Sequence, residues 1–150
     1  MAKFEFKLNT ILNLKKQLEE QAKLKLGQAI TVLNHELALL HSYEDAISMT
    51  IDEFRVISGG MFTVSKIKEY NVFIKKMKEK AEEQRIVVHE AEEYVETVRK
   101  ELILAVQQRE MYDNIREKEY DRYIIEEKHN EQMIVDEIVS YKIGCSLSAK

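Results

Sequence analysis

The four histidines are the residues of this sequence best suited to metal or acid–base chemistry, and their spacing is poor for both. His35 and His41 are six residues apart, whereas a helical zinc pair needs histidines at positions i and i+4. His89 and Glu93 do have that spacing, but a solvated surface pair is the commoner role for such residues. The sequence therefore predicts no metal site.

The other candidates for catalysis are the single cysteine, Cys145, and adjacent carboxylates such as Glu92-Glu93. Cys145 has no histidine near it in sequence that could activate the thiol. The carboxylates lie in charged runs, where nothing would bury one of them as acid catalysis requires. The sequence also lacks a glycine-rich phosphate loop. We therefore predict a protein that is not an enzyme and holds no cofactor.

The charge balance limits the classes of partner. The chain has 23 basic and 27 acidic residues, a net charge of −4, which does not favour nucleic acid. The basic run of residues 75–80 is interpreted as a solvated helix face. No apolar run approaches the roughly 18 residues of a membrane span, so we expect no direct lipid insertion. The first seven residues alternate charge with phenylalanine, unlike a signal peptide, and predict a cytoplasmic protein.

Long helices are the elements that the composition favours. The 150 residues include no proline and only four glycines, so helix breakers are scarce. Apolar residues recur in alternating four- and three-residue steps through residues 26–54 and, more regularly, through residues 67–105. Arg109 interrupts the second series, and Gly59-Gly60 is the strongest turn signal. We therefore expect an all-α protein with two long helices, the second longer than the first.

The boundaries follow from these signals. We expect a single coiled-coil domain over residues 1–150. Its first helix should cover about residues 3–57, its turn residues 58–62, its second helix about residues 63–142, and a disordered tail residues 143–150. Because so short a turn forces neighbouring helices to be antiparallel, we expect an antiparallel coiled-coil hairpin.

Blocks of net charge support the hairpin. Folding about Gly60 sets residues 36–60, with a net charge of −4, beside residues 61–84, with +2. It also sets residues 1–35, with +3, beside residues 85–117, with −3. Opposite flanking charges select orientation and register in coiled coils. Because the second helix is longer, its part from about Lys118 onward should lack a partner within the chain, which we expect to be a monomer.

Two aromatic residues, Tyr43 and Phe73, fall one position outside the apolar series. Folding about residue 60 brings them to similar heights near the bend, together with Leu40 and Met77. The four side chains could form an exposed apolar patch of the kind that marks an interface. Alternatively, the two aromatic rings could simply widen the core at that level.

Three motifs follow one another in order around the turn. Residues 4–15, FEFKLNTILNLK, fit the pattern F-x-F-x-L-x-x-[LIV]-L-x-[LY]-[KR]. Residues 70–74, YNVFI, fit Tyr-x-x-Phe-[LI] at the start of the second helix, and Glu131-Gln132 with Asp136-Glu137-Ile138 fits E-Q-x-x-x-D-E-I. In this order the three motifs resemble those of the FliJ family of flagellar type III export proteins.

The resemblance implies a non-enzymatic, stalk-like coiled coil in the flagellar export apparatus. Such a protein would insert into the ring of the export ATPase hexamer, couple it to the membrane export-gate protein, and escort export chaperones. It would work in the cytoplasm, peripherally associated with the membrane-bound export apparatus, and would serve motility.

The same resemblance implies two contact surfaces. The first, called the gate patch here, would face the export gate and consists of Glu36, Leu40, Tyr43, Ile47, Phe73, Met77 and Gln84. The second, called the ring end, would face the ATPase and consists of Phe4, Phe6, Leu8, Ile11, Tyr120, Ile124, Glu131, Gln132 and Ile138.

Two alternatives stay open at this point. One is a stalk protein of an injectisome, the virulence secretion system, although the Phe4/Phe6 and Glu131/Gln132 motifs favour the flagellum. The other is a generic coiled-coil scaffold or dimerisation protein with no export role. Stable self-association through residues 118–140 would favour the scaffold.

Overall fold

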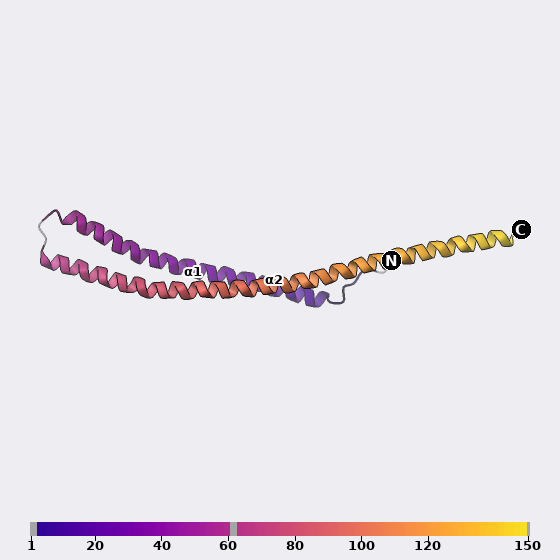
Figure 1. Cartoon of the computed structure of the whole chain (residues 1–150), viewed down its shortest axis with the longest axis horizontal. Coiled ribbons are helices and arrows are strands. Elements are labelled where there is room, and N and C mark those ends of the chain that lie inside the picture. Colours follow the sequence, from indigo (N-terminus) through magenta and orange to yellow (C-terminus); the bar gives the residue numbers. More distant parts are fainter. Residues whose placement is uncertain (1–2, 61–62, 150) are drawn as a thin grey trace. The chain divides into compact units, whose positions relative to one another are not determined.

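The computed structural model describes residues 3–60 and 63–149 and contains two helices (Figure 1). Helix α1 spans Asn9–Ile57, and helix α2 spans Val64–Ser148. The helices have 49 and 85 residues, which confirms the prediction of an all-α protein whose second helix is the longer.

The ends of the helices near the bend follow from local sequence. α1 ends just before Gly59-Gly60, because each glycine costs a helix about 1 kcal/mol relative to alanine. The Gly60 N–H donates to the Ile57 carbonyl at 2.9 Å and closes the last turn. α2 begins after Thr63, whose carbonyl accepts a hydrogen bond from the Lys66 N–H at 3.0 Å. Residues 61 and 62 of the predicted turn lie outside the described residues.

The chain divides into two compact units. We call the first the terminal unit; it comprises Met1–Glu19 and Ala105–Lys150. We call the second the bend unit; it comprises Glu20–Leu104. Each unit contains part of α1 and part of α2. The expectation of a single domain stays a prediction.

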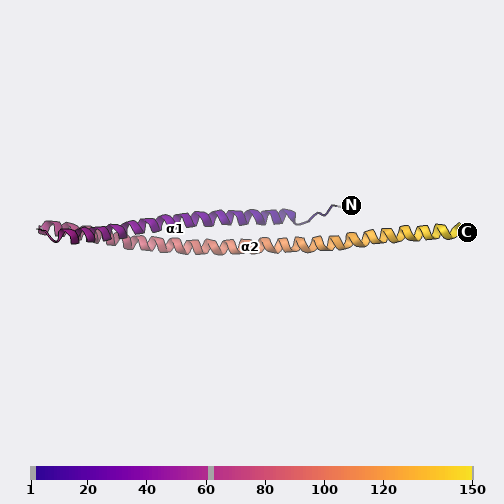
Figure 2. The same ribbon diagram turned by 90° about the horizontal axis from the view of Figure 1, so that it is seen from above.

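In the bend unit, α1 and α2 lie side by side in both views (Figures 1 and 2). Lys25 Nζ lies 2.8 Å from Glu101 Oε2, and farther along α1 the Phe54 ring centroid lies 5.9 Å from that of Tyr70. Residue numbers rise along one helix as they fall along the other, which confirms antiparallel pairing. The core of this unit contains Leu40, Ala81 and Val88, with Leu33, Leu37 and Tyr43 packed against it.

In the terminal unit, the first segment of the chain also runs antiparallel to α2. Lys15 Nζ donates to Gln108 Oε1 at 3.0 Å, and the ring centroid of the earlier residue Phe4 lies 5.2 Å from that of the later residue Tyr120. Leu12 is fully buried in this unit, and Phe6 is also buried.

The start of α1 differs from the prediction, which placed it near residue 3. Residues 3–6 have no regular secondary structure, residues 7 and 8 form a turn, and α1 begins at Asn9. Chain outside a helix can advance up to about 3.3 Å per residue, against 1.5 Å in a helix, which lets this segment reach farther along α2. Phe4 therefore packs against both Tyr120 and Tyr123. As a result, the uninterrupted run of exposed residues in α2 begins at residue 128 and not near Lys118.

The end of α2 also differs from the prediction, which placed a disordered tail over residues 143–150. α2 continues to Ser148, because the sequence holds no proline to stop it. The hydroxyls of Ser146 and Ser148 donate back to the carbonyls of Ile143 and Gly144, at 2.8 and 3.1 Å. Within the described residues, neither helix combines the length and the apolar character needed to cross a membrane.

Candidate partner-binding surfaces

The histidines and the cysteine occupy solvated positions. His89 Nε2 lies 3.4 Å from Glu93 Oε1, and both side chains are about 70% exposed. Cys145 is an exposed free thiol. Among residues 3–60 and 63–149, no three His, Cys, Asp or Glu side chains are grouped so that they could hold a metal ion. His89 and Glu93 thus form a surface pair.

The gate patch lies wholly in the bend unit, and most of it is covered by the chain itself. Six of its seven residues are wholly or partly buried, and one is exposed. The buried residues are Leu40 and Gln84, the partly buried ones are Glu36, Tyr43, Ile47 and Met77, and the exposed one is Phe73.

Two residues of the gate patch bind each other. Gln84 Nε2 donates to the backbone carbonyl of Glu36 at 3.0 Å and to its carboxylate oxygen Oε2 at 2.5 Å. Gln84 is a polar residue within the apolar series of α2, and burial of such a side chain is favourable only when it is hydrogen-bonded. The pair therefore holds α1 against α2 at this level.

The structure separates the two aromatic residues of the gate patch. Tyr43 packs against the core of the bend unit, and Lys80 Nζ lies 5.9 Å from its ring centroid. Phe73 is 42% exposed. It lines an open groove together with Thr50, Glu53, Lys66, Glu69 and Tyr70. Tyr43 thus widens the core, and the Phe73 ring is partly exposed to solvent.

Sequence reasoning missed Thr50, which adjoins Phe73 in this groove. Thr50 is buried, and its hydroxyl donates to the Ala46 carbonyl at 2.7 Å, so the polar group is satisfied. Heptad spacing gave no signal for this burial, because the apolar series passes through Ile47, Ile51 and Phe54 and leaves Thr50 one position outside it.

The ring end lies wholly in the terminal unit. Its residues range from buried to exposed. Phe6 is buried; Phe4, Leu8 and Ile124 are partly buried; and Ile11, Tyr120, Glu131, Gln132 and Ile138 are exposed.

An aromatic cluster joins the two chain segments of the ring end. The Phe4 ring centroid lies 5.2 Å from that of Tyr120, edge to face, and 5.5 Å from that of Tyr123. The pKa of Tyr123 is raised above its ordinary value, mainly by burial and secondly by the negative charge of the Glu127 carboxylate. The residue set predicted for the ring end omitted Tyr123, although its spacing of three residues from Tyr120 places both on one helix face.

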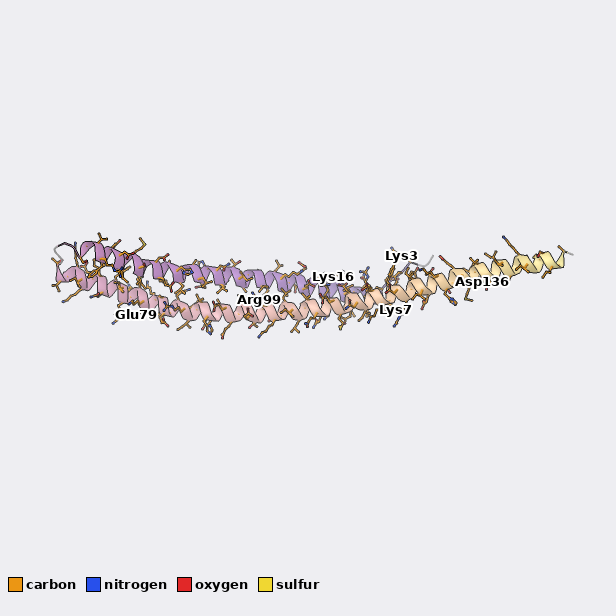
Figure 3. All side chains as sticks on the ribbon, turned by 45° about the horizontal axis from the view of Figure 1, so that its top comes forward. Lys3, Lys7, Lys16, Glu79, Arg99 and Asp136 are labelled. Atoms are coloured by element: carbon orange, nitrogen blue, oxygen red, sulfur yellow. The ribbon has the colours of Figure 1, made fainter. Side chains whose placement is uncertain are left out.

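Beyond this cluster, α2 has an uncovered end, which we define as residues 128–149. Every residue in it is exposed, including Glu131, Gln132 and Ile138 of the ring end. Figure 3 labels Asp136 within this part of α2. The uncovered end therefore offers its whole surface to a partner.

Arg109, which interrupts the apolar series, forms a polar layer in the terminal unit. Its Nε donates to the carboxylate of Glu19, and its Nη1 donates to Asp113 Oδ2 at 2.6 Å. These hydrogen bonds, that to Glu19 foremost, raise the pKa of Arg109 above its ordinary value. Because Glu19 is buried, the layer favours the one register in which these groups meet.

Comparison with known proteins gives a match over most of the chain. The model of a family described as "Flagellar FliJ protein" matches residues 4–146, which takes in parts of both units. No significant similarity to a curated protein or to a solved structure was found.

Proposed function

The chain belongs to the flagellar FliJ family, a non-catalytic component of the flagellar export apparatus, and we propose that it acts there as a stalk-like coiled coil. In this proposal the ring end inserts into the ring of the export ATPase hexamer, and the gate patch contacts the membrane export-gate protein. The chain thereby couples the two and also escorts export chaperones. It does so as a cytoplasmic monomer that associates peripherally with the membrane-bound apparatus.

The uncovered end of α2 is the observation that carries this proposal. An isolated helix owes most of its stability to packing of its apolar face, and residues 128–149 make no such packing within the described chain. The uncovered end follows directly on the aromatic cluster of Phe4, Tyr120 and Tyr123. A protein partner that receives this end would supply the missing contacts.

The exposed ring of Phe73 supports the contact with the gate. Aromatic residues are enriched in protein interfaces, and Phe73 lies in a groove that a partner's side chain could enter. The remaining residues of the gate patch would then act chiefly by holding this surface in place, because most of them are covered.

Site-specific photo-cross-linking in the full chain tests both contacts. A benzoylphenylalanine replaces either Gln132 or Phe73, with the ATPase and the cytoplasmic part of the gate protein of the same bacterium present. We expect position 132 to cross-link to the ATPase and position 73 to the gate protein. Val72, which is 67% exposed, provides the control position beside Phe73.

The outcome that contradicts the proposal is equally specific. Cross-links from position 73 to the ATPase, with none from position 132, would reverse the assignment of the two surfaces. Absence of cross-links from both positions to both proteins would remove the stalk function.

A further inference from the structure

The last part of α2 differs sharply in composition from the part before it. Of the 20 residues 113–132, 11 are charged, whereas residues 133–149 include only three charged residues, Asp136, Glu137 and Lys142. We call residues 133–149 the apolar tip. Its large apolar residues are Met133, Ile134, Val135, Ile138, Val139, Tyr141, Ile143 and Leu147.

These eight side chains are all in contact with solvent. Their exposed fractions run from 48% for Val139 to 74% for Tyr141. In the bend unit, by contrast, α2 buries Val95 and Val98 almost completely. A concentration of apolar surface of this kind marks an interaction site.

The apolar side chains of the tip surround the helix. Successive residues of an α-helix are rotated by about 100°, since one turn takes 3.6 residues. Ile134 and Ile143, nine residues apart, therefore project from opposite sides. Met133 and Val135 project from the two flanks between them. A helix that is apolar on one face fits a groove, whereas one that is apolar all round is enclosed.

We propose that the apolar tip is enclosed by an apolar collar in the bore of the export ATPase ring. This inference rests on the proposed function, in which the terminal unit enters that ring. The collar presents aliphatic and aromatic side chains, not charges, to the tip. It admits one helix, about 10–12 Å across, to a depth of about 24 Å, the length of residues 133–148 at 1.5 Å per residue.

The shape and charge of the tip favour a collar over other kinds of partner. A second copy of this helix, or a groove, would cover one face and leave apolar side chains exposed on the other. Two acidic residues against one basic residue make the tip unsuited to an anionic membrane surface. The densely charged residues 113–132 would lie outside the collar itself, in a wider part of the ring where water is available.

Two matched substitutions in the full chain test the collar. Ile134 and Ile143 are 56% and 54% exposed and lie on opposite faces, so Ile134→Glu and Ile143→Glu place a charge on each side of the tip. Both should weaken binding to the ATPase hexamer at least about tenfold, because a collar desolvates either charge. Leu24→Glu, at a residue that is 69% exposed and lies in the bend unit, should bind like the unaltered chain. Circular dichroism should show equal helix content in all of these proteins.

Cys145 provides an independent readout inside the tip. It is an exposed thiol and the chain's one cysteine, so iodoacetamide alkylation at this residue can be followed by mass spectrometry. Saturating ATPase hexamer should slow the alkylation at least about tenfold, because the collar excludes the reagent.

The possible results separate the collar from the proposed function. If one glutamate variant binds weakly and the other normally, the tip lies in a one-sided groove and the collar is wrong. If both variants bind normally and Cys145 stays reactive, the collar is wrong while the stalk function stands. If the unaltered chain does not bind the ATPase, the stalk function fails first. Self-association, or binding to phosphatidylglycerol vesicles, that either glutamate abolishes would assign the tip to a second copy or to the membrane and overturn the collar.

Discussion

Truncating Tyr43 and Phe73 separately should affect two different properties of the protein. Tyr43 packs on the core of the bend unit, whereas Phe73 is 42% exposed beside an open groove. We expect Tyr43→Ala mainly to lower the free energy of unfolding. We expect Phe73→Ala mainly to weaken binding to the export-gate protein.

The magnitudes follow from burial. Truncating a fully buried phenylalanine to alanine costs about 3–5 kcal/mol, so the partly buried Tyr43 should cost about 2–3 kcal/mol. Phe73 is only partly buried, so its truncation should cost about 1–2 kcal/mol of stability. If its ring is an anchor in a partner's pocket, the loss of about 2 kcal/mol of binding energy corresponds to about thirtyfold in affinity.

Two measurements on each variant separate these effects. Thermal and denaturant unfolding report stability, and calorimetry reports binding to the cytoplasmic part of the gate protein. Val72→Ala is the matched control, because Val72 adjoins Phe73 in sequence and is 67% exposed; it should change neither property appreciably. A Phe73→Ala protein that is destabilised by about 3–5 kcal/mol but retains its gate affinity would refute the reasoning, because Phe73 would then be core.

Two further predictions concern the terminal unit. Leu12 is fully buried and Leu14 is 51% exposed, so Leu12→Ala should cost about 2–5 kcal/mol in denaturant unfolding and Leu14→Ala about 0.5 kcal/mol or less; equal losses would contradict the observed packing. Arg109→Met should lower the melting temperature by several degrees, because buried Glu19 loses its hydrogen bond to the guanidinium. Adding Glu19→Met should restore most of the lost melting temperature, because two apolar side chains then continue the apolar series. A double variant that melts below the single one would contradict this.

Some features of the candidate sites could be predicted from the sequence because they depend on local spacing. Tyr43 and Phe73 stand one position outside the apolar series in the sequence. In the structure Tyr43 is partly buried and Phe73 is 42% exposed. Whether each ring is covered depends on the facing helix. Lys80 and the core side chains lie over Tyr43, whereas Phe73 borders a groove. Spacing along one helix carries no information about these neighbours.

The non-helical start of the chain shows the same limit. Residues 3–8 hold no residue that forbids a helix, and the sequence alone predicted one. The aromatic surface of Tyr120 and Tyr123, more than 110 residues away, is what Phe4 packs against. Contacts between residues so distant in sequence override weak local preferences.

The sequence by itself determined the two helices, their antiparallel pairing and the place of the bend, because heptad spacing, the absence of proline and Gly59-Gly60 act within a few residues. It also determined that the end of α2 would lack a partner within the chain, since one helix is simply longer than the other. Only the tertiary structure decided where that uncovered end begins and which aromatic side chains are buried. These properties depend on which side chains meet across the two helices, and that is set by register and by how far the non-helical start of the chain reaches along α2.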